Sequence, residues 1–289
     1  MIMKIKLLVA LALILSITAC KKEKNTLTDP TPQSNCFIKT VEDSKGILVY
    51  NYDAENRVYK IEKFDGNGLE FYQTYTYSNN LVLKKFFEGN GTELGEQVGE
   101  IHNGRITNKT TVFTSTTSPD VFTYTTTTNY VYEYNSTGFL TKRTLVANTT
   151  TNNPNDHLDY TVNYITTYSY ENDNLIKKVS NFLGSTYRNR TITETYEYYT
   201  GKDNVVNLGS DIAYDIDENY LLGKLSKNLI KNKLIVDQEE TNTSTTNYAY
   251  TYTYDANGKP EKINKVITEI YIGATFNYNS THKLTLNCK

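Results

Sequence analysis

The sequence predicts an all-β domain, an antiparallel meander of hairpins that closes, or nearly closes, into a barrel. Three observations support this prediction. Tyrosines recur at alternate positions before polar turns, threonine-rich stretches connect these copies, and a cysteine lies at each end of the repeating region. Sequential hairpins form a meander, and joining its first and last strands closes it. A long twisted sheet folded over into a sandwich is the alternative.

The clearest copy of the repeating unit is YTYTYDANGKPEKI, in which Tyr250, Tyr252 and Tyr254 precede Asp255 and Gly258. The three rings share one face because successive side chains of a strand alternate between its faces. Asp, Asn and Gly favour the turn that follows, and an apolar residue and a Lys then open a second strand. We expect these lysines to be solvated, with their stems covering apolar surface. Four further copies begin at the pairs Tyr50 and Tyr52, Tyr75 and Tyr77, Tyr132 and Tyr134, and Tyr168 and Tyr170.

Weaker signals extend this pattern through the rest of the chain. EIHNGRITNK contains Asn103 and Gly104, a two-residue hairpin signal, and YEYYTGKDNVV resembles the unit more loosely. Between copies, a run rich in β-branched Thr reverses at Ser118 to Asp120. We expect about fifteen strands, with the lumen filled by tyrosines and by residues 207–236. A short helix is predicted near 218–230, from the spacing of its leucines.

The first residues predict export. Residues 1–19 combine Lys4 and Lys6 with an apolar run and small residues, the pattern of a signal peptide. The four residues that end at Cys20 resemble the lipobox of bacterial lipoproteins, which implies lipidation of Cys20 and attachment to a membrane. A signal peptide cut elsewhere, or a short membrane anchor, is the alternative.

A charged, proline-containing tether follows the lipidated cysteine. Residues 20–35 have no apolar period, so they predict a solvated linker to a single all-β domain at 36–289. Lys21, Lys22 and Glu23 resemble the signal that exports some Gram-negative lipoproteins to the outer face of the outer membrane. We therefore expect an outer membrane lipoprotein on the cell surface, with the periplasmic face as the alternative.

Two cysteines remain once Cys20 is lipidated. Cys36 and Cys288 stand at the two ends of the folded region, and an isolated pair in an oxidising compartment is expected to bond. Such a bond would make the first and last strands neighbours. Two buried free thiols are the alternative.

The repeating unit also resembles known sequences. YxYDxxGxxxKI, clearest from Tyr252 to Ile263, resembles the tyrosine-aspartate (YD) repeats of secreted Rhs-type shell proteins. The whole arrangement of lipobox, tether, Cys36, YLLGKLSKNL and a terminal LNC resembles a family of uncharacterised Gram-negative surface lipoproteins. The resemblance implies an all-β lipoprotein, and it does not imply any catalytic residues.

Little in the sequence predicts chemistry. After loss of the signal the net charge is about −4, which does not favour nucleic acid. His102, His157 and His282 fall in predicted turns without metal-ligand spacing, so neither a metal site nor a cofactor is expected. The acidic cluster Asp211, Asp215, Asp217 and Glu218 is interpreted as a solvated loop, because it lacks the EF-hand pattern that would favour calcium.

The tyrosine rows are the remaining candidates for function. Their members are Tyr132, Tyr134, Tyr168, Tyr170, Tyr250, Tyr252 and Tyr254, which either bind a ligand or fill the core. Outward rings would favour binding, and inward rings would favour a core. The positions between them are Thr, Asn, Glu and Ser, which does not favour a lipid-facing wall.

These observations support a non-enzymatic surface lipoprotein that binds a glycan, a peptide or a partner protein. A purely structural envelope protein is the first alternative, and it predicts a uniformly polar exterior. A carbohydrate-active enzyme is the second alternative, and it predicts two carboxylates in a cleft.

Overall fold

The chain forms a closed antiparallel barrel of sixteen strands in sequence order. The computed structural model describes residues 36–117, 122–152, 160–183, 190–206, 208, 221–240 and 242–288. The strands are β1 (Cys36–Asp43), β2 (Gly46–Tyr52), β3 (Val58–Asp65), β4 (Gly68–Ser78), β5 (Leu81–Glu88), β6 (Glu93–His102), β7 (Arg105–Thr117), β8 (Phe122–Tyr134), β9 (Leu140–Thr151), β10 (Tyr160–Glu171), β11 (Asn174–Leu183), β12 (Arg190–Asp203), β13 (Asn228–Glu239), β14 (Asn242–Tyr254), β15 (Pro260–Tyr271) and β16 (Ala274–Cys288). The predicted all-β meander and its closure are confirmed.

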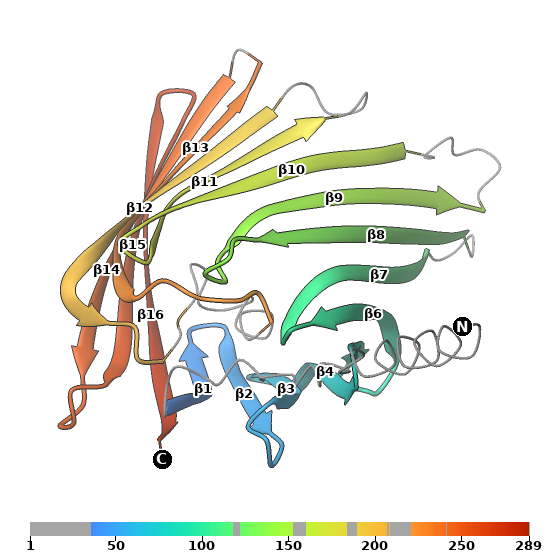
Figure 1. Ribbon diagram of the computed structural model, residues 1–289, viewed down its shortest axis with the longest axis horizontal. Coiled ribbons are helices and arrows are strands. Elements are labelled where there is room, and N and C mark those ends of the chain that lie inside the picture. Colours follow the sequence, from blue (N-terminus) through green and yellow to red (C-terminus); the bar gives the residue numbers. More distant parts are fainter. Residues whose placement is uncertain are drawn as a thin grey trace, which may run out of the picture.

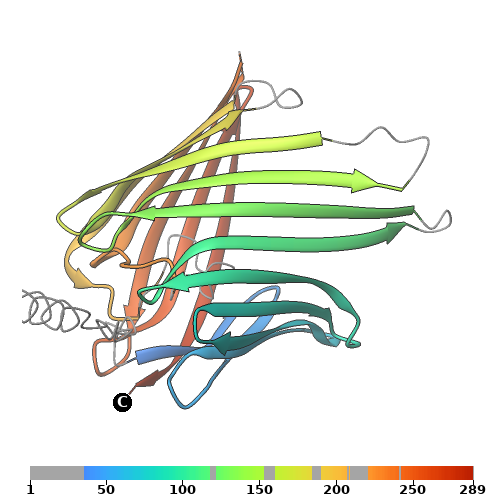
Figure 2. The ribbon, with the colours of Figure 1, turned by 45° about the vertical axis from the view of Figure 1, so that its right-hand side comes forward.

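The barrel closes where β1 pairs with β16. Cys36 and Cys288 are register partners in this pair and form a disulfide. In Figures 1 and 2 the strands wrap into one wall, and the C-terminal end of β16 reaches β1. The first residue of β1 and the last residue of β16 therefore lie at the same end of the barrel, which we call the base. The opposite end is the rim.

All five predicted tyrosine turns lie at the base, because each connects an even-numbered strand to the next odd-numbered one. In three of them the same side-chain hydrogen bonds hold the loop. The Oδ1 atom of Asp255 accepts from the backbone amides of Asn257 and Lys259, and Asp53 and Asn135 accept in the same way. Each of these three loops also has one residue with the left-handed (αL) backbone conformation. These residues are Asn56, Gly138 and Gly258, and both residue types tolerate positive φ.

The tyrosine rows face the interior. Tyr132 and Tyr250 are 4% and 3% exposed, and Tyr134, Tyr168 and Tyr252 pack partly buried against the core clusters. Outward positions alternate with them and are mostly polar. They are Thr243, Thr245, Asn247, Ala249, Thr251 and Thr253 on β14, and Thr275, Asn277, Asn279, Thr281, Lys283 and Thr285 on β16.

Five inward tyrosines bond the backbone of the preceding strand near the base. Tyr252 donates from its hydroxyl to the carbonyl of Ile230 at 2.9 Å. The equivalent bonds join Tyr52 to Ile38, Tyr77 to Val58, Tyr134 to Ile106 and Tyr198 to Leu175. Each acceptor lies at a register shift, where a bulge interrupts the ladder and leaves backbone groups to be satisfied.

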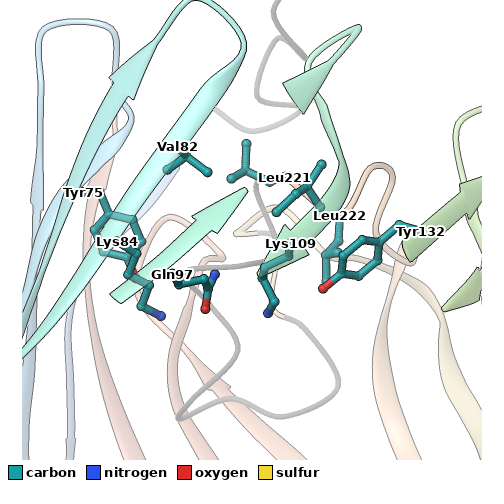
Figure 3. A pocket seen from close by; sticks show the side chains of 9 residues that line it. Tyr75, Val82, Lys84, Gln97, Lys109, Tyr132, Leu221 and Leu222 are labelled. Atoms are coloured by element: carbon teal, nitrogen blue, oxygen red, sulfur yellow. The ribbon is translucent and has the colours of Figure 1, made fainter. Parts of the chain in front are cut away.

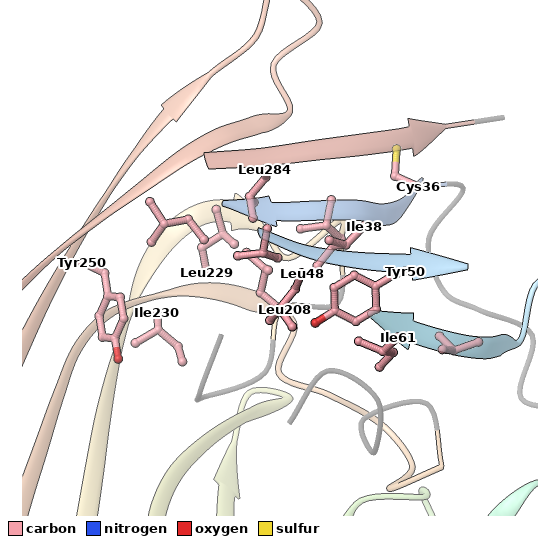
Figure 4. Packing of buried hydrophobic residues seen from close by; sticks show 14 of the residues in the cluster. Cys36, Ile38, Leu48, Tyr50, Ile61, Leu208, Leu229, Ile230, Tyr250 and Leu284 are labelled. Carbon is pink, nitrogen blue, oxygen red and sulfur yellow. The ribbon is translucent and has the colours of Figure 1, made fainter. Parts of the chain in front are cut away.

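The hydrophobic core gathers at the base. Ile38, Val58, Leu229 and Ile263 are at most 2% exposed there. Figure 4 shows this packing between the strand ends and the connection that follows β12. From that connection Leu208 enters the core, and Leu221 and Leu222 pack against the second cluster around Tyr132. The prediction that residues 207–236 help to fill the lumen is confirmed for these leucines.

The predicted helix is wrong in its described part. Residues 218–220 lie outside the described residues, residues 221–227 form turns and irregular backbone, and β13 begins at Asn228. Backbone groups here bond other loops, not helical partners: Lys224 donates to the carbonyl of Gly138, and Lys227 to that of Asp173. Hydrogen bonds to distant loops therefore set the backbone conformation here, in place of the helix that the leucine spacing predicts.

Two further expectations also fail. YEYYTGKDNVV does not form a hairpin, because β12 continues to Asp203 with a register shift after Tyr198. His282 lies within β16 and not in a turn, opposite Ile263 in the ladder, and is 4% exposed. The Asn103–Gly104 turn is confirmed, with both residues at positive φ.

Candidate lumenal binding site

Six inward cations form what we call the cationic belt. Its members are Lys84, Lys109, Arg143, Lys178, Lys233 and Lys265, one on each odd-numbered strand from β5 to β15. Each lies directly opposite a tyrosine in the ladder. The pairs are Tyr75 with Lys84, Tyr130 with Lys109, Tyr132 with Arg143, Tyr168 with Lys178, Tyr196 with Lys233, and Tyr250 with Lys265.

The belt cations lie against aromatic faces. The Nζ atom of Lys109 is 4.3 Å from the ring centroid of Tyr130, and Nζ of Lys233 is 4.6 Å from that of Tyr248. Arg143 lies between Tyr130 and Tyr164, at 5.9 and 5.4 Å. A cation is attracted to the face of an aromatic ring, so these contacts stabilise the observed arrangement. The belt is therefore a wall of paired cations and flat rings.

Arg143 has unused hydrogen-bonding capacity. Its Nη2 atom donates to the hydroxyl of Tyr164 at 3.1 Å, whereas its buried Nε has no hydrogen-bond partner among the described residues. A guanidinium carries five N–H donors in a planar fork that matches a carboxylate.

Two carboxylates lie close to the belt in the described part of the wall. Glu194 pairs with Lys178 and accepts from the hydroxyl of Tyr196 at 2.7 Å. Burial alone would lower the pKa of Lys178, but Glu194 outweighs it and raises that pKa above its ordinary value. Asp43 lies 3.6 Å from Nδ1 of His282.

A small pocket lies between β4 and β8, on the side of the belt that faces the base of the barrel. Its volume is about 20 Å³, enough for one water molecule. Figure 3 shows the polar ends of Lys84, Gln97 and Lys109 on one side, with Val82 and Leu221 on the other. The lumen thus changes at this level from a polar wall to an apolar floor.

Nearer the rim, the hairpin of β15 and β16 carries exposed aromatic side chains. Tyr271, Phe276 and Tyr278 are 48%, 45% and 50% exposed, and we call them the rim shelf. Their register with Ile267 and Lys265 places them on the inward face, above the belt. Glu269, opposite Phe276, is the carboxylate of this shelf.

A second hollow of about 370 Å³ lies at the base, outside the belt. Phe139, Asp173, Asp203, Lys224 and Lys227 are among its lining residues. Its two carboxylates and two lysines nearly cancel, so no ligand charge is favoured there.

The structure brings the predicted tyrosine rows together inside the barrel. Their inward direction argues against a binding patch on the outer wall, although it leaves the lumen as a place for a ligand. Cys20 and the acidic cluster from Asp211 to Glu218 lie outside the described residues.

The cationic belt was missed at the level of sequence, where the lysines after each turn are expected to be solvated. That holds for Lys142, which is exposed and pairs with Glu133. The missed signal is the basic doublet: in Lys142–Arg143 and Lys177–Lys178, the two-residue strand period places one cation on each face.

Neither a metal centre nor a membrane-spanning helix is found in the described part of the chain. No group of three or more His, Cys, Asp or Glu there is placed to hold a metal ion. No helix there is long and apolar enough to cross a membrane.

Comparison with known proteins identifies the fold alone. No family profile matches the chain, and no curated protein matches its sequence. A porin-like protein from Bacteroides uniformis is similar in structure, with a TM-score of 0.58 and 17% identity, over 90% of this chain and 99% of that one. A porin-like protein from Bacteroides vulgatus has a TM-score of 0.55 and 14% identity, over 87% and 98%. The chain therefore shares the barrel architecture of porin-like proteins.

Proposed function

We propose that this protein is a lipid-anchored, non-enzymatic barrel of the outer membrane that binds a ligand in its lumen. The observation that carries the proposal is the contrast between the two faces of the wall. The inner face pairs six cations with tyrosines, whereas the outer positions of β14 and β16 are almost entirely Thr, Asn and Lys. The porin-like fold supports an outer-membrane address.

Lipid on Cys20 would attach the barrel to the membrane more readily than its wall would. A lipid-facing strand needs apolar outward residues across about 25 Å, and the outer positions of β14 offer Ala249 as the single apolar residue among the six. Because β1 starts at the base, the tether would hold the base toward the membrane and turn the rim away from it. The rim would then receive the ligand.

Two of the described lumenal carboxylates are held in ion pairs, which supports binding over catalysis. Glu194 is held by Lys178 and Tyr196, and Asp237 forms a bidentate pair with Arg190. A glycosidase needs one carboxylate to give up a proton and the other to attack or activate water. Glu194 and Asp237 are both engaged by basic side chains, so neither is left available to act on a substrate.

A structural role in the envelope is the second candidate, because a polar exterior is what that role predicts and the outer positions of β14 and β16 are mostly polar. The two candidate functions make different predictions for the lumen. In a purely structural protein the paired cations and rings would serve packing alone, whereas in a binding protein they would also contact a ligand.

Fractionation and protease shaving of cells that express the full chain test the address. Wild type should label with palmitate and be cut on intact cells, whereas Cys20→Ala should leave the membrane fraction. Retention of Cys20→Ala in the membrane would show that the wall itself is inserted.

A binding screen tests the function. The full-length lipoprotein in detergent should be stabilised against heat by at least one member of a glycan and peptide panel, and Tyr278→Ala at the rim should weaken that effect. A panel without any stabilising member would favour the envelope role.

A further inference from the structure

We propose that the ligand is an extended peptide of a partner protein, which adds a strand to the rim half of β16 and lays its apolar side chains on the rim shelf. This inference rests on the proposed function and names the ligand class for the rim end of the lumenal site. It is carried by an unpaired strand edge and by the exposed rings beside that edge.

The rim half of β16 is paired on one side only. Ala274 to Lys283 pair with β15, whereas β1 reaches only Lys283 to Cys288. No other strand in the described part of the chain pairs with β16, and Ala274 to Asn279 are all exposed. Figures 1 and 2 show β1 as a short strand beside the lower end of β16, which rises well above it. The wall therefore leaves an open edge above β1.

The turn between β15 and β16 fixes which backbone groups face this edge. Ile272 and Gly273 form a two-residue turn at positive φ, and the residues that flank it, Tyr271 and Ala274, are register partners. Partners that flank such a turn exchange hydrogen bonds, and bonded pairs recur at every second residue. The alternate residues of β16 point their N–H and C=O groups away from β15. We call them the free edge: Thr275, Asn277, Asn279 and Thr281.

The free edge has none of the usual protection against pairing. Natural proteins blunt exposed edges with charged side chains, prolines or bulges. The run from Ala274 to Thr281 contains neither a charge nor a proline, and its ladder with β15 has no register shift. Its unbonded groups recur at the two-residue period of an extended chain, which is the pattern that a guest strand can satisfy.

The rim shelf lies on the inward side of the same edge. Phe276 and Tyr278 are 45% and 50% exposed and alternate with the free edge along β16. Six of the sixteen exposed large apolar side chains of the described residues lie on this hairpin: Val266, Ile270, Tyr271, Ile272, Phe276 and Tyr278. A guest strand has the same period, so its inward side chains would contact the rings and its outward ones would lie beside Thr and Asn. The chemistry therefore favours a peptide that alternates apolar with uncharged polar residues.

One charge refines this choice at the level of Phe276. Glu269 is the register partner of Phe276 on the inward face, so it would lie two strand spacings, about 10 Å, from the guest. A long basic side chain on the inward face of the guest would approach this carboxylate, and an acidic one would be repelled. The peptide is therefore expected to be neutral or basic there.

A second copy of this chain fits the edge less well than a peptide. Two copies of the free edge would pair antiparallel, which inverts one barrel relative to the other. One base would then point away from the membrane that holds both lipids. A peptide has no such restriction, and it can run antiparallel to β16 in line with β1.

Titration calorimetry on the full-length lipoprotein in detergent tests the proposal with a synthetic heptapeptide. The probe is acetylated and amidated, with threonine at every odd position and Val, Tyr and Lys between them. It should bind at least about 10-fold more tightly than a scrambled peptide that lacks the alternation, and replacement of its Lys by Glu should weaken it. Equal affinity of the alternating and scrambled peptides would overturn the proposal.

Backbone methylation of the probe separates strand addition from simple stacking on the rings. Threonines on the outward side lie opposite the free edge and point their N–H groups at it, whereas the residues between them point theirs away. N-methylation of two inner threonines should weaken binding at least about 10-fold, because two hydrogen bonds are lost. N-methylation of two of the intervening residues should leave affinity within about 3-fold. Equal effects of the two modifications would show that no strand is added.

A matched pair of variants at one position locates the edge. Asn279→Pro removes an N–H group that faces away from β15, a place where an edge strand tolerates proline, and should weaken the heptapeptide about 10-fold. Asn279→Ala keeps that N–H group and should bind within about 2-fold of wild type. Equal affinity of both variants would place the peptide elsewhere. If Asn279→Pro fails to fold, the methylated peptides on wild type decide alone.

Two further outcomes separate this inference from the proposed function. A glycan that stabilises the protein while no alternating peptide binds would overturn the peptide and keep the binding function; failure of every glycan and peptide would overturn both. Sedimentation of the wild type as a dimer that Asn279→Pro abolishes would assign the edge to a second copy, against the proposal.

Discussion

The base and the cationic belt of this barrel use the same residue, tyrosine, for different purposes. At the base the hydroxyl of Tyr252 bonds a carbonyl that a bulge has released, and the ring packs among aliphatic side chains. At the belt Tyr130 and Tyr248 present ring faces to Lys109 and Lys233. The comparison teaches that distance from the turn decides whether an inward tyrosine completes the fold or lines a charged wall.

Loss of the disulfide should have the largest effect on the base. The bond between Cys36 and Cys288 closes a loop with a sequence separation of 252, for which chain entropy predicts up to about 5 kcal/mol. Denaturant unfolding of the full-length protein with and without reductant measures this. The double variant Cys36→Ser and Cys288→Ser should match the reduced wild type, and an unchanged midpoint would show that the β1–β16 ladder alone closes the barrel.

Truncation of a core residue at the base should cost slightly less. Ile263→Ala removes a side chain that is fully buried and should lower the free energy of unfolding by about 2–5 kcal/mol. Val266 on the same strand is 48% exposed on the outer wall, so Val266→Ala is the control and should cost under about 1 kcal/mol. Similar losses would mean that the base is not the stable part of the barrel.

Removal of one tyrosine hydroxyl separates the two uses of the residue. Tyr252→Phe leaves the carbonyl of Ile230 without that donor and should destabilise the protein by about 1–3 kcal/mol. The half-exposed Tyr278 of the rim shelf provides the comparison, and Tyr278→Phe should change stability by less than about 0.5 kcal/mol. Thermal unfolding of both variants decides whether the hydroxyls at the base are structural.

The smallest expected effect is a pH dependence where base and belt meet. Burial, followed by the charge of Lys265, lowers the pKa of His282 below 6.5, and Asp43 opposes this shift. As pH falls through 6.5 the unfolded chain takes up the proton first, so stability is complete above that pH and declines below it. His282→Asn should flatten the slope of unfolding free energy between pH 6.5 and 5. An unchanged slope would assign the dependence to other groups.

The hairpins, their closure and the disulfide could be predicted, because each depends on local sequence or on the two cysteines alone. Asp255 and Gly258 specify a turn wherever they lie, and the tyrosine period fixes a shared face. That the rings would fill the lumen was expected, but no local pattern fixes the direction of their face. It depends on how sixteen strands close, and in a closed barrel an inward face can be a core at one level and a lined lumen at another.

The elements that were predicted wrongly depend on contacts between distant segments. His282 stands in a turn-like run of polar residues, yet its strand is fixed by pairing with β15. Leu221 follows a helical spacing, yet it lies in a connection where its carbonyl accepts from the amide of Ile106 on the distant strand β7. Such bonds arise only once the barrel has formed, so local patterns carry no trace of them.

The bond between Cys36 and Cys288 makes the described wall a covalent circle, since sixteen strands and their connections then have no free end. A single proteolytic cut at a rim turn, such as the one at Gly273, would leave one continuous molecule. The ends of the strands at the base could equally be joined by a peptide and new termini opened at the rim. The order of strands in space, and not the place where the chain starts, is what defines this protein.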